Sequence, residues 1–229
     1  MERHSRAGKG AARKRRAYDA SGRLAQAARA RACIVDVAEQ MFFADGYAAT
    51  TMVAIAASAG ASVETIYKAF GGKAGLVRAI RDRRLAGQGP VHAEVRSNRA
   101  RRAAGGARAL VAEWGRLTAE VAPLVAPVLL LVRDAAVADP EMEALRAELD
   151  ADRLRRMTAN ARTLRQLGYL RPGVTTREAA DVLWTFSSPE LYELLVLGRK
   201  WPLARYGDFV TGTLTSALLD VIVVDDSRT

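Results

Sequence analysis

Side chains that bind metals or form disulfides are scarce in this 229-residue chain. Cys33 is the single cysteine, so a small secreted domain held together by intramolecular disulfides is excluded. With only His4 and His92 beside that cysteine, no His/Cys spacing of a structural zinc site can be written. We therefore expect no metal and no cofactor, and we expect the chain to work in the reducing cytoplasm.

Catalytic motifs are also absent from the sequence. It contains no His-Glu-x-x-His and no Gly-x-Ser-x-Gly. Gly71-Gly72-Lys73 lacks the earlier glycine of a phosphate-binding P-loop, because Tyr67 stands at that position. We expect a protein that is not an enzyme.

Aromatic residues make up only 6% of the chain, and the β-branched alternation that strands need is rare. Alanine and leucine dominate the hydrophobic residues, which make up 50% of the chain, and this composition predicts an all-α fold. The most hydrophobic run, residues 121–132, contains two prolines and ends before Arg133. Because a membrane span requires roughly 20 residues, we predict a buried helix there and no membrane contact.

The net positive charge is confined to one end of the chain. Residues 1–100 carry 18 Lys and Arg against 8 Asp and Glu, whereas residues 101–229 carry 17 of each sign. Such asymmetry is typical of a polyanion-binding domain joined to a neutral one. Residues 1–22 include Arg13-Lys14-Arg15-Arg16 and no apolar periodicity, which predicts a disordered basic arm. This arm is either a solubilising tail or a segment that lies along DNA phosphates.

Residues 23–86 have the pattern of a three-helix domain. Apolar residues at helical spacing predict a helix over 24–45, with Cys33 buried beside the apolar face. Thr51 and Ser62 are suitable N-caps for two short helices, over about 52–59 and 63–70, and Gly60 ends the first. Two short helices joined by a tight glycine-containing turn form a helix-turn-helix. A further helix is predicted over 73–85.

Residues 87–229 form the second predicted domain, whose helices follow a glycine-bearing boundary loop over 97–106. The pattern there predicts helices over 107–121, 123–138, 140–167, 176–187 and 205–222. Asp139-Pro140 is a typical helix start, and Thr175 with Glu178 fits a capping box.

The spacing within residues 46–76 is specific. It consists of Gly46-Tyr47, Thr50-Thr51-Met52-Val53-Ala54-Ile55-Ala56, Ala59-Gly60-Ala61-Ser62-Val63-Glu64-Thr65-Ile66-Tyr67, Phe70, Lys73 and Leu76. This run resembles the DNA-binding domain of the TetR family of bacterial transcriptional regulators, over about residues 24–84. The helical body, with Ser188-Pro189-Glu190-Leu191-Tyr192 and Trp201, is similar to the C-terminal domain of actinobacterial-type members. The resemblance implies a C-terminal domain that binds an effector and forms a homodimer.

Candidate DNA-binding residues follow from the second short helix and from the resemblance. Val63, Glu64 and Lys68 can project from its exposed face, where Val63 suits a thymine methyl group and Glu64 suits cytosine N4. Glu64 has an alternative role as a partner of the helix dipole. By the resemblance, the phosphate-binding positions are occupied by Thr51, Ser62, Thr65, Tyr67 and Lys73. Helix capping is the alternative to phosphate binding for Thr51 and Ser62, and core packing is the alternative for Tyr67. Ala69 departs from the residue pattern of the family at its position.

The C-terminal domain supplies candidates for an effector pocket and for a dimer interface. Large apolar residues that could surround a pocket are Trp114, Leu117, Leu131, Met157, Leu164 and Trp184. A four-helix interface between two copies is predicted for Leu183, Leu191, Leu194, Leu195, Val210, Leu214 and Leu218. Ordinary core packing is the alternative for both sets.

The sequence thus predicts a homodimeric regulator of transcription that binds a palindromic operator in double-stranded DNA. We expect a repressor that a small, mostly apolar effector releases. The alternative is a basic helical protein that binds membrane surfaces, or nucleic acid without sequence preference.

Overall fold

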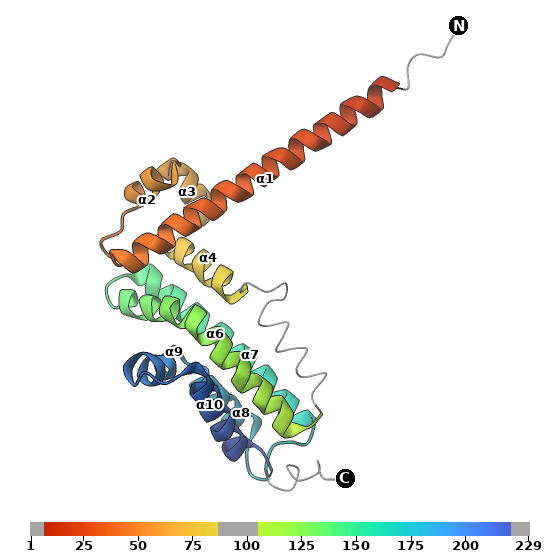
Figure 1. Cartoon of the computed structure of the whole chain (residues 1–229), viewed down its shortest axis with the longest axis vertical. Helices are drawn as coiled ribbons and strands as arrows, with labels where there is room; N and C mark the ends of the chain where they lie inside the picture. Colours follow the sequence, from red (N-terminus) through yellow and green to blue (C-terminus); the bar gives the residue numbers. More distant parts are fainter. Residues whose placement is uncertain (1–6, 87–104, 221–229) are drawn as a thin grey trace. The chain divides into compact units, whose positions relative to one another are not determined.

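The computed structural model describes residues 7–86 and 105–220, and the regular elements in these ranges are helices (Figure 1). One isolated antiparallel bridge joins Leu170 to Leu219. The predicted all-α fold is confirmed. The chain divides into two compact units, Met1–Leu76 and Val77–Thr229. This division falls inside helix α4 (Lys73–Ala86), whereas the sequence predicted a boundary at the end of that helix, after residue 86.

Helix α1 spans Ala7–Ala44 and is much longer than the predicted helix over 24–45 (Figure 1). Residues 7–22 are therefore helical where the sequence predicted a disordered arm, and residues 1–6 of that arm lie outside the described ranges. The prediction was wrong because it required an apolar stripe. Residues 7–22 instead contain many Ala, Arg and Lys residues, which have high intrinsic helix propensity, and no proline.

Cys33 is exposed, so the prediction that it is buried was wrong. The buried face of α1 is formed by Ile34, Val35, Ala38 and Phe42. Residues three and four apart share a helix face, and Cys33 lies one position before this set, on the neighbouring face.

The helix-turn-helix consists of α2 (Met52–Ala59) and α3 (Val63–Phe70), as the sequence predicted. Gly60 ends α2 with φ of 62°, and Gly71 ends α3 with φ of 81°, a left-handed conformation that glycine adopts without strain. Ile55 of α2 and Ile66 of α3 are fully buried in the N-terminal unit. These two anchors fix which face of each short helix remains exposed.

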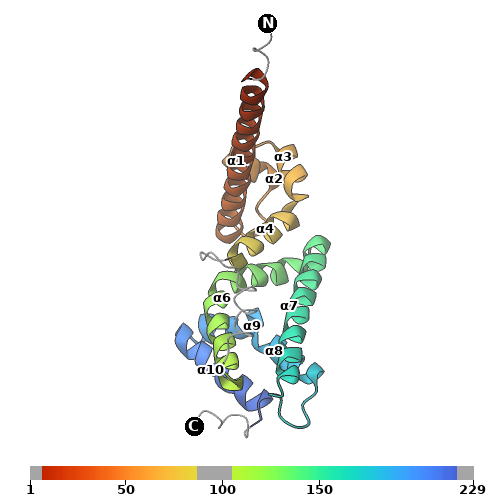
Figure 2. The ribbon, with the colours of Figure 1, turned by 90° about the vertical axis from the view of Figure 1, so that its right-hand side faces the viewer.

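The C-terminal unit is built on α6 (Ala107–Ala136) and α7 (Pro140–Gln166). The sequence predicted two helices, 107–121 and 123–138, where α6 is one helix that contains Pro123 and Pro127. Proline removes a backbone hydrogen bond and kinks a helix without necessarily ending it. Figure 2 shows the resulting change of direction along α6.

The remaining helices are α8 (Thr176–Phe186), α9 (Pro189–Tyr192), the π-helical turn η1 (Glu193–Gly198) and α10 (Leu203–Leu218). The capping box predicted for Thr175 and Glu178 is present at the start of α8. The sequence did not predict α9 and η1, because a four-residue helix and a π turn lack the 3.6-residue period. Helix α10 ends at Leu218, and residues 221–222 of the predicted helix lie outside the described ranges.

One hydrophobic core fills the C-terminal unit, with Trp114, Leu164, Leu183 and Tyr206 among its buried members. Within the described residues, α6 is long and apolar enough to cross a membrane by length and composition. This is weak evidence for a span, because core helices of globular proteins also meet that test. Leu110, Val111 and Val128 of α6 are buried inside the unit, as a core helix requires.

Helices α6 and α10 approach closely at two glycines. A Cβ atom on Gly115 would lie 2.0 Å from Thr211 Oγ1 and 3.0 Å from the Gly207 carbonyl oxygen. A Cβ atom on Gly207 would lie 3.1 Å from the Cβ of Ala119. At Gly115 an added Cβ atom would force a neighbouring atom to move, whereas at Gly207 the contact would be tight and the neighbouring helix would have to shift slightly.

We predict that Gly115→Ala lowers the free energy of unfolding by about 1–3 kcal/mol, since the added methyl group overpacks the crossing. The matched control is Gly212→Ala on α10, where a Cβ atom meets nothing within 4 Å. That change should raise the free energy of unfolding by about 0.5–1 kcal/mol, because alanine favours helix. Urea denaturation followed by circular dichroism measures both, and shifts of the same sign would contradict the proposed crossing.

Candidate nucleic-acid interface and ligand cavity

Side-chain hydroxyls cap both helices of the helix-turn-helix. Thr51 Oγ1 accepts a hydrogen bond from the Ala54 amide at 3.1 Å, and Ser62 Oγ accepts one from the Thr65 amide at 3.1 Å. The Ser62 and Thr65 hydroxyls are also 2.7 Å apart, so one donates to the other. A hydroxyl that accepts in a cap can still donate its hydrogen. Capping and phosphate binding are therefore compatible at Thr51 and Ser62.

The exposed face of α3 carries most of the residues that the sequence predicted for DNA contact. Four of these residues are exposed: Glu64, Thr65, Tyr67 and Lys68. Val63 is less accessible, because it is half-buried. The Tyr67 side chain is 51% exposed, which argues against the alternative that it is a core aromatic residue. These side chains can reach a ligand along one face of α3.

Lys73 lies at the start of α4 and is partly engaged within its own domain. Its ammonium donates to the Tyr47 carbonyl oxygen and lies 4.0 Å from the centre of the Tyr47 ring. This hydrogen bond and the contact with the ring hold the ammonium charge in place. Lys73 thus has a positioning role that the sequence analysis missed.

Arg31 of α1 holds the C-terminal end of α3 and was also missed. Its guanidinium donates to the Ala69 carbonyl oxygen at 2.7 Å and lies 4.0 Å above the Phe70 ring. A cation at the last carbonyl groups of a helix satisfies them and interacts favourably with the helix dipole. A separation of 38 residues leaves no local sequence signal for this bond.

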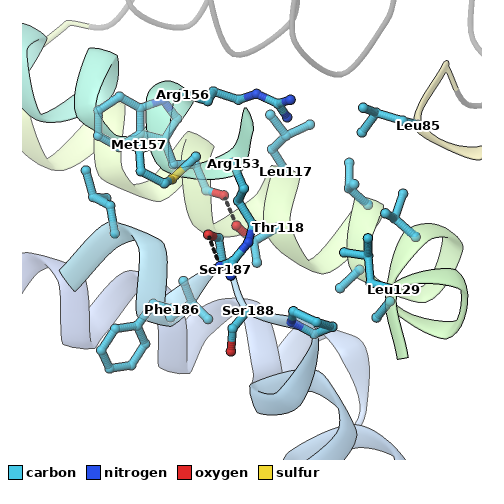
Figure 3. A pocket seen from close by; sticks show the side chains of 18 of the residues that line it. Leu85, Leu117, Thr118, Leu129, Arg153, Arg156, Met157, Phe186, Ser187 and Ser188 are labelled. Carbon is cyan, nitrogen blue, oxygen red and sulfur yellow. Dashed lines mark hydrogen bonds between the residues drawn. The ribbon is translucent and has the colours of Figure 1, made fainter. Parts of the chain in front are cut away.

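A cavity of about 160 Å³ lies inside the C-terminal unit, between α4, α6, α7, α8 and α10 (Figure 3). Of the six predicted pocket residues, Trp114, Leu117 and Met157 line it. The other three do not line it. Leu164 is fully buried in the core, Leu131 is half-buried elsewhere, and Trp184 lies beneath the Arg153 guanidinium at 4.2 Å.

The cavity wall has a basic side that the sequence analysis did not predict. Arg81, Arg153 and Arg156 line it, and no carboxylate does among the described residues. Arg153 donates to the Trp184 carbonyl oxygen, to Ser187 Oγ at 3.4 Å and to Asp150 at 3.2 Å. Burial lowers the pKa of Arg153 and the bond to Asp150 opposes that shift, while an arginine keeps its charge at neutral pH.

The predicted dimer interface needs correction at four of its seven residues. Leu183, Val210, Leu214 and Leu218 are at most 3% exposed and belong to the core of the unit. Helical periodicity identified an apolar face but could not tell an internal face from an external one. Leu191 and Leu195 are half-buried, and Leu194 is 65% exposed.

Comparison with known proteins agrees with this architecture. Residues 34–80 match the family model of bacterial regulatory proteins, tetR family. No curated protein matches the chain.

Several solved structures share the fold. The complex of SmeT, from Stenotrophomonas maltophilia, with triclosan is 22% identical with a TM-score of 0.66, over 85% of this chain and 94% of SmeT. FadR from Bacillus subtilis in complex with stearoyl-CoA is 20% identical with a TM-score of 0.63, over 81% and 98%. A putative TetR-family regulator from Rhodococcus sp. is 16% identical with a TM-score of 0.60, over 83% and 99%.

The fold and the α2–α3 site define an all-α protein with an N-terminal helix-turn-helix domain and a C-terminal helical domain. Within that class, residues 34–80 match the model of bacterial regulatory proteins, tetR family, and the chain shares its fold with solved TetR-family regulators.

We predict that Arg31→Ala loosens the C-terminal turn of α3. Loss of the bond to Ala69 and of the stacking on Phe70 should cost about 1 kcal/mol, which makes amide hydrogen exchange in this turn roughly fivefold faster. Hydrogen-exchange mass spectrometry of peptides covering residues 63–71 measures the effect.

Arg29→Ala is the matched control, because it removes the same charge from the same exposed stretch of α1. It should leave exchange in α3 unchanged. If both variants accelerate exchange equally, the contact of Arg31 with α3 does not stabilise that helix.

Proposed function

We propose that this chain is a homodimeric regulator of transcription, a repressor that binds a palindromic operator and is released by a small effector. The observation that carries the proposal is the exposed polar face of α3 within the residues that match the tetR-family model. We also propose a cytoplasmic location and a binding function without catalysis.

The chemistry of α3 supports base and phosphate contacts. Glu64 and Lys68 are exposed on a helix whose opposite side is anchored by the buried Ile66, so both side chains can approach base edges in a major groove. The Ser62 and Thr65 hydroxyls, together with the backbone amides of the first turn, suit the flanking phosphates. Val63 is half-buried and suits a smaller role, at a thymine methyl group.

The cavity supports a response to an effector. Arg81 and Leu85 of α4 line it, and the same helix begins at Lys73, which we propose as a phosphate contact. A ligand that prefers one position of α4 would bias the protein toward that state. Two of the similar structures contain small molecules: SmeT is in complex with triclosan, and FadR is in complex with stearoyl-CoA. By analogy, we propose that this cavity is the effector site.

The exposed apolar side chains of the last helices support a dimer interface. Leu194 and Leu197 of η1 are 65% and 42% exposed, and Leu203 and Phe209 of α10 are 40% and 38% exposed. We propose these residues as the interface, with Leu191 and Leu195 at its edge. Pairing two copies would present two α3 helices to successive half-sites of a palindrome, about one helical turn apart.

We predict that selection from a pool of random DNA duplexes, at near-physiological salt, enriches a palindrome. Glu64→Gln and Lys68→Ala should each change or abolish the preference at particular positions, by about 1–3 kcal/mol. Lys73→Met should weaken binding to all sequences alike. Arg177→Ala, an exposed cation on α8, is the control for loss of charge.

The alternative functions predict different results from the same selection. Salt-sensitive binding without enrichment would indicate a protein that binds nucleic acid without sequence preference. Binding to anionic vesicles as tight as binding to DNA would indicate a membrane-surface protein. Either result would overturn the proposed regulator.

We predict that Leu194→Asp converts the dimer to a monomer, because it places a charge in a buried apolar contact between two copies. Sedimentation velocity at micromolar concentration measures the change. Val137→Asp is the matched control, since Val137 is 89% exposed at the end of α6 and lies outside the proposed interface. A wild-type monomer, or a Leu194→Asp dimer, would rule the interface out.

A further inference from the structure

Three residues that line the cavity carry buried polar atoms without a hydrogen-bond partner in the described part of the chain. Among the described residues, four buried side-chain nitrogen or oxygen atoms make no hydrogen bond. Three of them belong to residues that line the cavity: Arg81 Nε, Trp114 Nε1 and Tyr206 Oη. Because buried polar groups are nearly always paired, these three atoms call for a partner that the described part of the chain does not supply.

These orphan atoms specify the chemistry of their partner. The indole N–H of Trp114 and the guanidinium N–H of Arg81 can only donate. Burial, with a contribution from Tyr192, raises the pKa of Tyr206 to about 12, so its hydroxyl keeps its proton at neutral pH and can donate as well. A molecule that satisfies all three must offer acceptor atoms.

The charge of the wall selects among such acceptors. Two of the cavity arginines pair with carboxylates that lie outside the lining: Asp82 pairs with Arg81 at 2.7 Å, and Asp150 pairs with Arg153 at 3.2 Å. Only three of the five guanidinium N–H groups of Arg153 are bonded to acceptors in the described part of the chain. The basic side of the cavity therefore favours an anion over a neutral acceptor.

The rest of the lining is apolar. Figure 3 shows Arg153 extending to Ser187 at the centre of the view, with Leu117, Leu129, Met157 and Phe186 around it. Val121, Val125 and Leu183 continue this surface. A site with apolar walls and a few convergent polar groups is typical of a pocket for an amphiphilic small molecule.

We propose that the cavity binds a small amphiphilic anion, whose apolar body contacts the aliphatic and aromatic wall. Its carboxylate, or an equivalent anionic head group, accepts hydrogen bonds from the arginines and the orphan donors. A cavity of about 160 Å³ admits a short aliphatic chain or a single ring. This inference rests on the proposed effector function of the same cavity and names the class of effector.

A series of ligands that share one alkyl chain and differ in the charge of the head group tests the inference. Octanoate, 1-octanol and octylammonium are titrated into the full-length protein by calorimetry at neutral pH. Octanoate should bind at least about tenfold more tightly than the other two, since hydrogen bonds to a charged group are the stronger ones. Equal affinity for the three heads, or no octanoate binding up to millimolar concentration, overturns the inference.

Single substitutions identify the side chains that discriminate between the head groups of the ligands. Arg81→Gln and Arg156→Gln should each weaken octanoate binding about tenfold and leave octanol binding unchanged. Arg155→Gln is the matched control: Arg155 lies on the same helix, is 71% exposed and does not line the cavity. If Arg155→Gln has the same effect as Arg156→Gln, general surface charge accounts for the preference and the inference fails.

Trp114→Phe and Tyr206→Phe distinguish a role of these donors in ligand binding from a role in stability. Each removes an orphan donor and keeps an aromatic ring, so Tyr206→Phe should leave the thermal midpoint of the free protein unchanged or raised. Both variants should nevertheless bind octanoate several-fold more weakly. Unchanged octanoate affinity in both would overturn the assignment of these donors to the ligand.

The proposed function is measured separately, by the effect of octanoate on binding to the selected operator. Binding that prefers the anionic head but leaves operator affinity unchanged supports the inference and contradicts the proposed effector response. Operator release by octanol and octanoate alike, with equal affinities, supports the effector response and contradicts the inference.

Discussion

The close approach of α6 and α10 at Gly115 and Gly207 is the contact on which the C-terminal unit depends. Each glycine comes directly after a large aromatic residue that lines the cavity: Trp114 precedes Gly115, and Tyr206 precedes Gly207. Close approach at the glycines thus brings Trp114 and Tyr206 to the wall of one cavity. A side chain at Gly115 would force a neighbouring atom to move at this crossing, beside both aromatic residues.

The N-terminal unit contains two helices of only about two turns each, and helices this short are not stable in water on their own. Hydroxyl caps at Thr51 and Ser62 begin α2 and α3, and left-handed glycines end them. Ile66 secures α3 from the inside, and Arg31 secures it from outside at its last turn. Contacts at both ends of α3 hold the polar face that remains, which limits the conformational entropy lost when it meets a ligand.

Local features were predictable from the sequence, and long-range ones were not. The caps at Thr51 and Thr175 join residues three apart, so residue type and spacing were sufficient. The bond from Arg31 to Ala69 joins distant segments and gives no local pattern. Apolar periodicity identified Trp114 and Leu164 equally well, but only packing decides that the first lines the cavity and the second lies in the solid core.

The exposed position of Cys33 has a practical consequence. It is the only cysteine in the chain and lies on α1, within the unit that carries the helix-turn-helix. A thiol-reactive spin label or fluorophore would therefore attach at one defined place per subunit, without any engineered mutation. In the proposed dimer, the distance between the two labels would report the separation of the two helix-turn-helix units, with and without a ligand in the cavity.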